Sequence, residues 1–303
     1  MKLLHIALMT LPILAGAAPA DRTSFPLWPE GVPSAKSSAS PEMLEDGRHS
    51  NVHEPTLTYI APAVDKPNGT AVVIAPGGGY SRLSTEREGI QYANWLSTLG
   101  VTSFVLKNRL QEFGHPAPLQ DMLRAIRIVR SRAAEFGIDP KRIGAMGSSA
   151  GGHLAASAGT LFDLPEGRTG AKHDAVSGRP DFLILMYPVI TMRDPAAHAG
   201  SREALLGANP TEAMLLLASL DEQVTTATPP TLLIHTQEDA SVPVENSILF
   251  FQALTRAGVP AEMYLFEKGE HGMGMRAGLG TASEWPKRAE EWLRARGLLD
   301  RGK

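Results

Sequence analysis

The chain has 303 residues, of which 43% are hydrophobic and 20% charged, and its net charge at pH 7 is −3. A chain of this length can bury a large core, so we expect one large α/β domain. Its near-neutral charge, without a run of lysine and arginine typical of nucleic-acid binding, argues against a nucleic-acid partner.

Residues 1–20 have the composition of an export signal. Lys2 precedes an apolar run from Leu3 to Leu14, and small residues then offer A-x-A cleavage sites after Ala17 or Ala20. The alternative is a buried N-terminal helix. The apolar run is too short to span a bilayer comfortably, so we expect no membrane partner. The chain has no cysteine and therefore no disulfide. We expect a periplasmic or secreted protein.

An extended arm is expected over residues 21–52, lying over the main domain. The segment contains four prolines, which break regular elements: Pro26, Pro29, Pro33 and Pro41. The main domain is expected from residue 53 to 303. Its first strand is predicted from Thr56 to Ile60. Ala71 to Ala75 is a continuous apolar run, typical of a strand buried on both faces of a parallel sheet.

That second strand leads directly into Pro76-Gly77-Gly78-Gly79-Tyr80. Consecutive glycines weaken helices and strands, but they let backbone amides approach a ligand closely. We interpret the amides of Gly78 and Gly79 as donors of an oxyanion hole. The alternative is a phosphate-binding loop, but no Lys-Ser/Thr follows the glycines and their spacing does not match G-x-G-x-x-G.

Strands and helices then alternate. We expect a helix from Ile90 to Leu99, a strand from Val101 to Leu106, a helix from Leu119 to Phe136 and a strand from Phe182 to Val189. This alternation predicts a doubly wound, mostly parallel sheet with helices on both faces. The second of these helices carries four arginines that we assign to its solvated face: Arg124, Arg127, Arg130 and Arg132.

A G-x-S-x-G sequence, residues 147–151, lies between the helix expected from Leu119 to Phe136 and the strand expected from Phe182 to Val189. An apolar run precedes it and an alanine-rich, helix-compatible run follows it. A strand that turns sharply into a helix needs small residues on both sides of the apex, as Gly147 and Gly151 are. Ser149 would then project from the strand end as a nucleophile, and the amide of Ala150 would complete the oxyanion hole. The alternative is a turn without chemistry, since the chain has 29 glycines.

From residue 191 to 227 the sequence consists of short polar and helical pieces with Pro195 and Pro210. We interpret this stretch as a small cap insertion over the sheet. Loops at the carboxyl ends of strands face the active site in open α/β sheets. The cap is therefore the expected place for substrate selection.

An acid and a histidine follow the last two expected strands. Asp239 comes just after the strand from Thr231 to Thr236, and His271 lies between glycines after the strand from Ala261 to Phe266. The order Ser149, Asp239, His271 matches the serine, acid, histidine order of this architecture. We expect Asp239 to orient His271, which takes the proton of Ser149.

Alternatives remain at each of these positions. Glu238 is the rival acid, and Asp239 could cap the following helix instead. His271 could be an ordinary loop histidine. His153 and His235 are interpreted as structural. The histidines show no metal-ligand spacing, so we predict neither a metal site nor a cofactor.

Four segments of the chain together resemble the α/β-hydrolase superfamily: Phe25 to Gly31, Ala75 to Tyr80, Gly147 to His153 and Glu267 to Gly272. More narrowly, the chain is similar to the carbohydrate-esterase-like branch, which includes acetylxylan esterases and bacterial feruloyl-esterase-like proteins. Relatives of the hormone-sensitive-lipase type begin the glycine motif with histidine. This chain has Pro76 there, which favours the carbohydrate-esterase branch.

The resemblance implies that residues 53–303 are a serine esterase domain whose partner is a small-molecule or oligosaccharide ester, with acetylated xylan as the expected substrate. Tyr80 would form a wall of the substrate site and stack on a sugar ring. A general short-chain carboxylesterase or lipase is the main alternative. A peptidase of the prolyl-oligopeptidase type is disfavoured because the chain has no room for a propeller domain. A non-catalytic binding protein is disfavoured because all three triad residues are retained.

Overall fold

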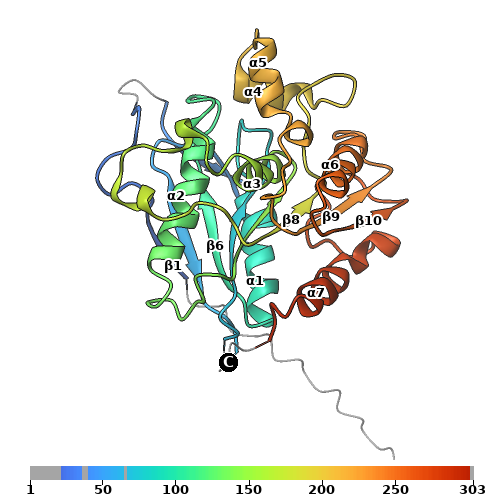
Figure 1. The fold of residues 1–303 in the computed structure, drawn as a ribbon, viewed down its shortest axis with the longest axis horizontal. Helices are drawn as coiled ribbons and strands as arrows, with labels where there is room; N and C mark the ends of the chain where they lie inside the picture. The colour runs from blue at the N-terminus through green and yellow to red at the C-terminus, as the bar shows by residue number, and fades with distance from the viewer. Residues whose placement is uncertain (1–21, 36–39, 65–66, 301–303) are drawn as a thin grey trace, which may run out of the picture.

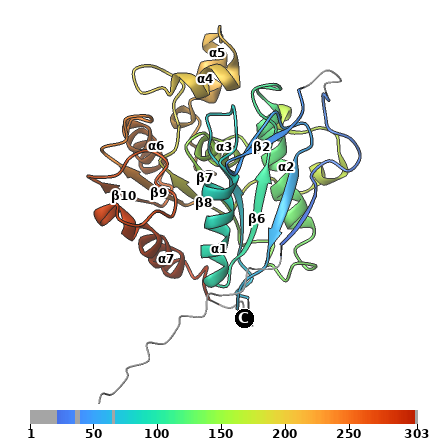
Figure 2. The same cartoon turned by 180° about the vertical axis from the view of Figure 1, so that it is seen from behind.

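The computed structural model describes residues 22–35, 40–64 and 67–300. Residues 1–20, for which the sequence predicts an export signal, lie outside the described residues. The described chain forms a sheet of eight strands in the order β1-β4-β6-β5-β7-β8-β9-β10, with helices on both of its faces (Figures 1 and 2). The predicted α/β fold with a doubly wound, mostly parallel sheet is confirmed.

The strands of the sheet are β1 (Arg22–Pro26), β4 (Thr56–Ile60), β5 (Ala71–Ala75), β6 (Thr102–Lys107), β7 (Ile143–Ser148), β8 (Phe182–Met186), β9 (Thr231–Thr236) and β10 (Ala261–Phe266). β4 pairs antiparallel with β1 and β6, and the other neighbours pair parallel. A separate hairpin consists of β2 (Met43–Glu45) and β3 (Arg48–Ser50). The α-helices are α1 (Gln91–Thr98), α2 (Ala117–Ser131), α3 (Ala150–Thr160), α4 (Ala199–Leu206), α5 (Glu212–Ala218), α6 (Glu245–Arg256) and α7 (Trp285–Ala295).

The sheet separates two apolar layers. In β5, Val73 belongs to the core that includes residues of α2, α3 and α6, whereas Val72 and Ile74 belong to the core that includes residues of α1 and α7. All of β5 is buried, which is why its sequence is apolar at every position rather than at every second one. No helix among the described residues is long and apolar enough to span a membrane.

Helix α7 is absent from the elements expected from the sequence. Its buried side chains recur at the spacing of an amphipathic helix, and they are Trp285, Ala289, Trp292 and Leu293. The signal for this helix is therefore present in the sequence.

The N-terminal arm, residues 21–52, contains three strands, so the expectation that its prolines exclude regular elements is wrong. β1 forms one edge of the sheet, and Pro26 is its last residue, where proline is tolerated. β2 and β3 are joined by Asp46-Gly47, whose φ angles of 48° and 72° are those of a tight hairpin turn. An Asp-Gly pair is a hairpin signal that the sequence contains.

The arm docks on α2 through polar contacts. The indole nitrogen of Trp28 donates a 2.7 Å hydrogen bond to Asp121 Oδ1. The guanidinium of Arg124 binds both carboxylate oxygens of Glu30, at 2.7 and 2.9 Å, and lies 4.6 Å from the centre of the Trp28 ring. The segment from Phe25 to Gly31 thus packs against α2 and is held there by hydrogen bonds and an ion pair.

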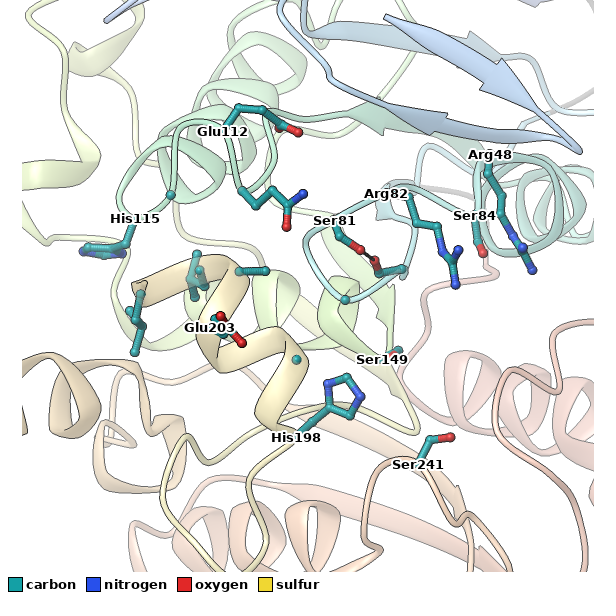
Figure 3. Close-up of a pocket in the computed structure, with 18 of the residues that line it drawn as sticks. Arg48, Ser81, Arg82, Ser84, Glu112, His115, Ser149, His198, Glu203 and Ser241 are labelled. Carbon is teal, nitrogen blue, oxygen red and sulfur yellow. Dashed lines mark hydrogen bonds between the residues drawn. The ribbon is translucent and has the colours of Figure 1, made fainter. Parts of the chain in front are cut away.

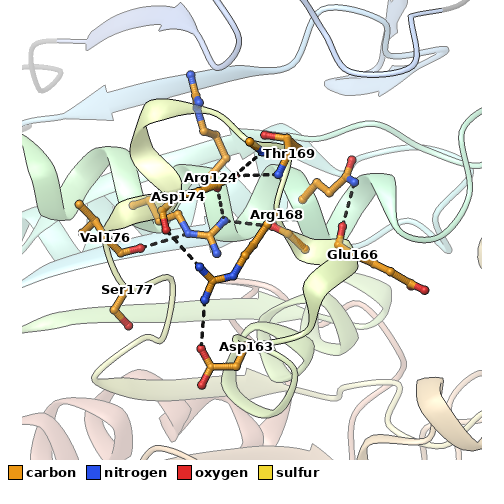
Figure 4. Close-up of polar contacts among 12 residues, drawn as sticks. Arg124, Asp163, Glu166, Arg168, Thr169, Asp174, Val176 and Ser177 are labelled. Carbon is orange, nitrogen blue, oxygen red and sulfur yellow. Dashed lines mark hydrogen bonds and ion pairs between the residues drawn. The ribbon is translucent and has the colours of Figure 1, made fainter.

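The assignment of four arginines to the solvated face of this helix is wrong for Arg124 and Arg127, whereas Arg132 is partly exposed. Arg124 and Arg127 are each only 2% exposed. The arm covers Arg124, and the loop after α3 covers Arg127, which donates to Asp174 Oδ1 at 2.9 Å within the polar network of Figure 4. Arg130 also pairs with an aspartate, Asp181, at 2.9 Å. A helix sequence shows which face is polar, but not which segment later covers it.

Asp121 is fully buried, and its carboxylate binds both Trp28 and the buried guanidinium of Arg109, at 2.8 Å. We predict that Asp121→Ala lowers the free energy of unfolding by about 3–5 kcal/mol, because it leaves a buried cation without its partner. Urea unfolding followed by circular dichroism measures this. Glu135→Gln, which removes a carboxylate from the exposed Arg132–Glu135 pair after the same helix, is the control and should leave the midpoint unchanged. Equal midpoints for both variants would contradict the prediction.

Candidate active site

Ser149 occupies the turn between β7 and α3 in a strained backbone conformation, with φ 54° and ψ −124°. The turn leaves no space for side chains at the flanking glycines. A Cβ on Gly147 would lie 2.0 Å from the carbonyl oxygen of Gly151, and a Cβ on Gly151 would lie 2.1 Å from that of Ala75. The steric reason for the G-x-S-x-G spacing is therefore visible in the structure.

The structure brings Ser149, His271 and Asp239 into one hydrogen-bonded chain. Ser149 Oγ lies 2.9 Å from His271 Nε2, and His271 Nδ1 lies 2.6 Å from Asp239 Oδ2. A carboxylate can only accept, so Nδ1 carries the hydrogen and Nε2 is free to accept the hydrogen of Ser149. This arrangement can take a proton from the serine hydroxyl.

Asp239 is almost fully buried, and several donors fix its carboxylate. Oδ1 accepts hydrogen bonds from the backbone amides of Ser241 and Val242, both at 2.9 Å. His235 Nε2 lies 3.4 Å from Oδ2. Burial opposes ionisation, but the hydrogen bonds from His235, His271 and Val242 outweigh it and hold the pKa of Asp239 well below its ordinary value. Asp239 therefore stays ionised beside His271.

The rival acid, Glu238, has a different place. Its Oε2 accepts a 2.9 Å hydrogen bond from the amide of Gly269, and the hydroxyl of Thr236 donates to the Gly269 carbonyl at 2.6 Å. Both contacts hold the loop that carries His271. Glu238 therefore binds the loop backbone, whereas Asp239 binds the imidazole.

Two of the three predicted oxyanion donors line the same cavity. Gly78 and Gly79 line the cavity together with Ser149 and His271. Ala150 is the first residue of α3, where helix geometry leaves amides without intrahelical acceptors. Among the described residues, no hydrogen bond has the amide of Gly78 or Gly79 as its donor. Their assignment to an oxyanion hole stays a prediction.

A buried glutamate that sequence reasoning missed lies behind the triad. Glu88 Oε2 accepts from the Gly77 amide at 2.9 Å, and Oε1 accepts from the Tyr187 hydroxyl at 2.8 Å. The Tyr187 ring packs edge-on against His271, with 5.1 Å between centroids. Burial raises the pKa of Glu88. Glu88 and Tyr187 thus connect the glycine loop to the His271 loop. No local sequence motif indicates this contact.

Tyr80 does not have the place expected for it. Its ring is 4% exposed, and its hydroxyl lies 2.8 Å from His153 Nδ1, while His153 Nε2 lies 2.8 Å from the carbonyl oxygen of Ala218. A buried ring offers no face to a sugar, so we assign no stacking to Tyr80. His153 and His235 are both buried and hydrogen-bonded, as expected for structural histidines.

The cavity over Ser149 has a volume of about 1130 Å³ (Figure 3). The segment predicted as a cap, residues 191–227, contains α4 and α5, and α4 forms part of the cavity wall. The residues of this segment that line the cavity include His198, Gly200, Glu203 and Leu205. His198 was not among the expected site residues, because nothing in the sequence around it indicates a function. Within the part of the chain that the structure describes, no group of three or more ligating side chains is arranged for a metal ion.

Residues 58–254 match the model of the BD-FAE family. The chain belongs to the BD-FAE family. It is 40% identical over 206 residues to endo-1,4-beta-xylanase B of Butyrivibrio fibrisolvens, covering 67% of this chain and 32% of that protein. It is 35% identical over 214 residues to the acetylxylan esterase of Xylanibacter ruminicola, covering 69% of this chain and 42% of that protein. The match thus spans about a third to two-fifths of these curated relatives.

Solved structures resemble this BD-FAE member over most of its length. The acetyl ester-xyloside bifunctional hydrolase of Caldicellulosiruptor lactoaceticus has a TM-score of 0.80 and 39% identity, covering 93% of this chain and 99% of its own. The carboxylesterase Cest-2923 of Lactobacillus plantarum has a TM-score of 0.69 and 28% identity, with 87% and 99% coverage. The predicted resemblance to α/β-hydrolases of the carbohydrate-esterase type is confirmed.

His153 makes the stability sensitive to acid. Burial lowers its pKa to about 4, whereas an unfolded histidine titrates near ~6.5. Below about pH 6.5 the unfolded chain therefore binds a proton that the folded chain does not, and stability is lost as the pH falls toward 4. We predict that the Tm of the wild type falls more steeply between pH 7 and 4.5 than the Tm of His153→Gln. Parallel Tm curves in a calorimetric pH series would show that His153 has no such role.

Proposed function

We propose that this chain is a serine carboxylic ester hydrolase that removes acetyl groups from xylan or its oligosaccharides. The observation that carries the proposal is the hydrogen-bonded chain from Ser149 through His271 to Asp239. A serine at a strained turn, a histidine able to accept its proton and an ionised acid form the arrangement used in nucleophilic acyl transfer.

In the proposed mechanism, Ser149 Oγ attacks the ester carbonyl as its proton passes to His271 Nε2. The negative charge that develops on the carbonyl oxygen is stabilised by the amides of Gly78, Gly79 and Ala150. The imidazolium then gives its proton to the leaving alcohol, and the acyl group stays on Ser149. Water deprotonated by His271 releases the acid and restores the serine.

The substrate part of the proposal rests on the similar proteins and on the cavity. The relatives include an acetylxylan esterase, and a solved structure of similar fold is an acetyl ester-xyloside hydrolase. A cavity of about 1130 Å³ is slightly above the range of about 300–1,000 Å³ for small-molecule sites, which supports an oligosaccharide substrate. The export signal predicted in residues 1–20 fits this activity, because polymeric substrates are degraded outside the cytoplasm.

A general short-chain carboxylesterase is the second candidate. The fold also resembles that of a Thermogutta terrifontis esterase solved with butyrate, at a TM-score of 0.69 and 27% identity. An acyl pocket discriminates by only about 1–3 kcal/mol per methylene, so chain length must be measured.

The proposed function first predicts which substrates are hydrolysed. We expect p-nitrophenyl acetate to be hydrolysed faster than p-nitrophenyl octanoate, and acetate to be released from acetylated xylo-oligosaccharides. Ser149→Ala should abolish both reactions, and an organophosphonate should add one adduct to the wild type but none to this variant. Efficient octanoate cleavage without acetate release from the oligosaccharides would favour the carboxylesterase. Adduct formation in Ser149→Ala would disprove the serine mechanism.

The proposed function also predicts that Asp239, and not Glu238, is the acid partner of His271. Asp239→Asn should lower kcat by roughly 10⁴-fold, because it removes the charge that orients and stabilises the His271 imidazolium. Glu238→Gln is the matched control. It keeps an oxygen that can accept from the Gly269 amide, so kcat should change far less. Steady-state kinetics on p-nitrophenyl acetate measures both variants. The larger loss in Glu238→Gln would mean that the acid is misassigned.

A further inference from the structure

Four arginines line the cavity that contains Ser149: Arg48, Arg82, Arg87 and Arg276. They come from three separate parts of the chain. Arg48 belongs to the β2–β3 hairpin, Arg82 and Arg87 follow the glycine loop, and Arg276 follows His271. We call them the cavity arginines. Because three segments contribute, this positive charge is not the by-product of one basic stretch of sequence.

Two of the cavity arginines, Arg48 and Arg82, lie on the side of the cavity nearer the nucleophile. Figure 3 shows Arg48 and Arg82 along one wall, on the same side as Ser149, with Glu112 and His115 toward the other end. The side chain of Arg82 passes over the glycine loop, since its Cγ lies 3.0 Å from the place that a Cβ on Gly78 would take. The stem of the Arg82 side chain therefore lies beside Gly78, one of the proposed oxyanion donors.

Specific contacts hold the hairpin that carries Arg48. The neighbouring His49 exchanges two backbone hydrogen bonds with Leu83, at 2.8 and 3.0 Å, and its Nδ1 lies 2.8 Å from the hydroxyl of Thr85. The hairpin is therefore attached to the loop that carries Arg82 and leads to Arg87. The N-terminal arm thereby contributes a charged side chain to the cavity.

The cavity arginines lack close carboxylate partners within the described part of the chain. No ion pair there involves Arg48, Arg82 or Arg87, and Arg276 has only a 4.0 Å contact with Glu270, whose side chain is 84% exposed. By contrast, the α2 arginines described above lie within 2.9 Å of their carboxylates. Glu88, Glu112 and Glu203 also line the cavity, but the mutual repulsion of the four arginines is not offset by close ion pairs among the described residues, so this cluster does not serve stability.

Glu88 follows Arg87 in sequence and lines the same cavity. Both of its oxygens are occupied by the amide of Gly77 and the hydroxyl of Tyr187. The chain as a whole carries a net charge of −3. A positive cavity end in a slightly acidic protein indicates a ligand that carries negative charge.

We propose that the cavity arginines bind a carboxylate carried by the ester substrate. The guanidinium group matches a carboxylate because its planar donors can bind both oxygens at once. The carboxylate could belong to a uronic acid in the oligosaccharide or to the acyl group itself. This inference rests on the proposed function, and it specifies that the preferred ester is an acidic one.

The first test measures turnover of paired esters. One pair consists of acetylated xylo-oligosaccharides with and without a uronic acid substituent, and the other of p-nitrophenyl acetate and p-nitrophenyl hemisuccinate. We expect kcat/KM for the carboxylate-bearing member of one pair to exceed that of its neutral counterpart on the order of tenfold at low salt. Added NaCl should reduce this ratio. The pair that shows the preference identifies where the carboxylate lies.

The variants are Arg48→Gln and Arg82→Gln, singly and together, and in the double variant the ratio should fall close to one. Arg288→Gln is the matched control. Arg288 lies on α7, pairs with Glu291 and does not line the cavity, so its loss removes the same charge elsewhere. The ratio should be unchanged in this control. An equal fall in Arg288→Gln would mean that only net charge matters, which overturns the inference.

A binding measurement keeps this inference separate from the esterase proposal. Calorimetry compares a deacetylated xylo-oligosaccharide that bears a uronic acid with the neutral oligosaccharide of the same length. If the wild type hydrolyses no ester but binds the acidic oligosaccharide about tenfold more tightly, only the proposed function fails. If neither turnover nor binding favours a carboxylate, the inference on the cavity arginines is wrong.

Discussion

The close approach of α3 to strands β5 and β7 determines where the site forms. The backbone of Gly151 lies so near the carbonyl oxygen of Ala75 that no Cβ fits between them. Because Ala75 ends β5, this contact brings the glycine loop that follows β5 beside the turn that holds Ser149. The nucleophile and the proposed oxyanion donors are therefore positioned by one packing contact, and any side chain there would separate them.

Buried carboxylates connect the parts that apolar packing alone would leave loose. Asp121 fastens the N-terminal arm to α2, Glu88 joins the glycine loop to the Tyr187 hydroxyl, and Asp239 holds the His271 imidazole. Each accepts more than one hydrogen bond, as a buried charged or polar group must to offset its desolvation. Loops, which have few apolar contacts of their own, are thus held at fixed positions around the cavity.

The sequence predicts the parts of the site that depend on local spacing and chain order. Ser149 and His271 lie at recognisable turns, and their order with Asp239 is typical of the fold. Features that depend on distant contacts were missed or misinterpreted. Glu88 lies outside the helix expected from Ile90 to Leu99 and no motif marks it, and Arg124 looks solvated because the arm that covers it is almost 100 residues away in sequence. The Asp46-Gly47 turn is different, because an Asp-Gly pair is itself a local hairpin signal.

The pairing of the N-terminal arm has a consequence for folding. β1 is at the start of the described chain, yet it pairs with β4, while His271 lies on a loop after the last strand. Contacts between residues far apart in sequence form late, because closing a long loop costs conformational entropy before the new contacts stabilise the fold. The hydrogen-bonded chain at Ser149 needs residues that follow β7, β9 and β10, so it can form only when these distant parts of the chain are in place. In the proposed function, ester hydrolysis would therefore report the joint folding of these parts rather than the presence of any one of them.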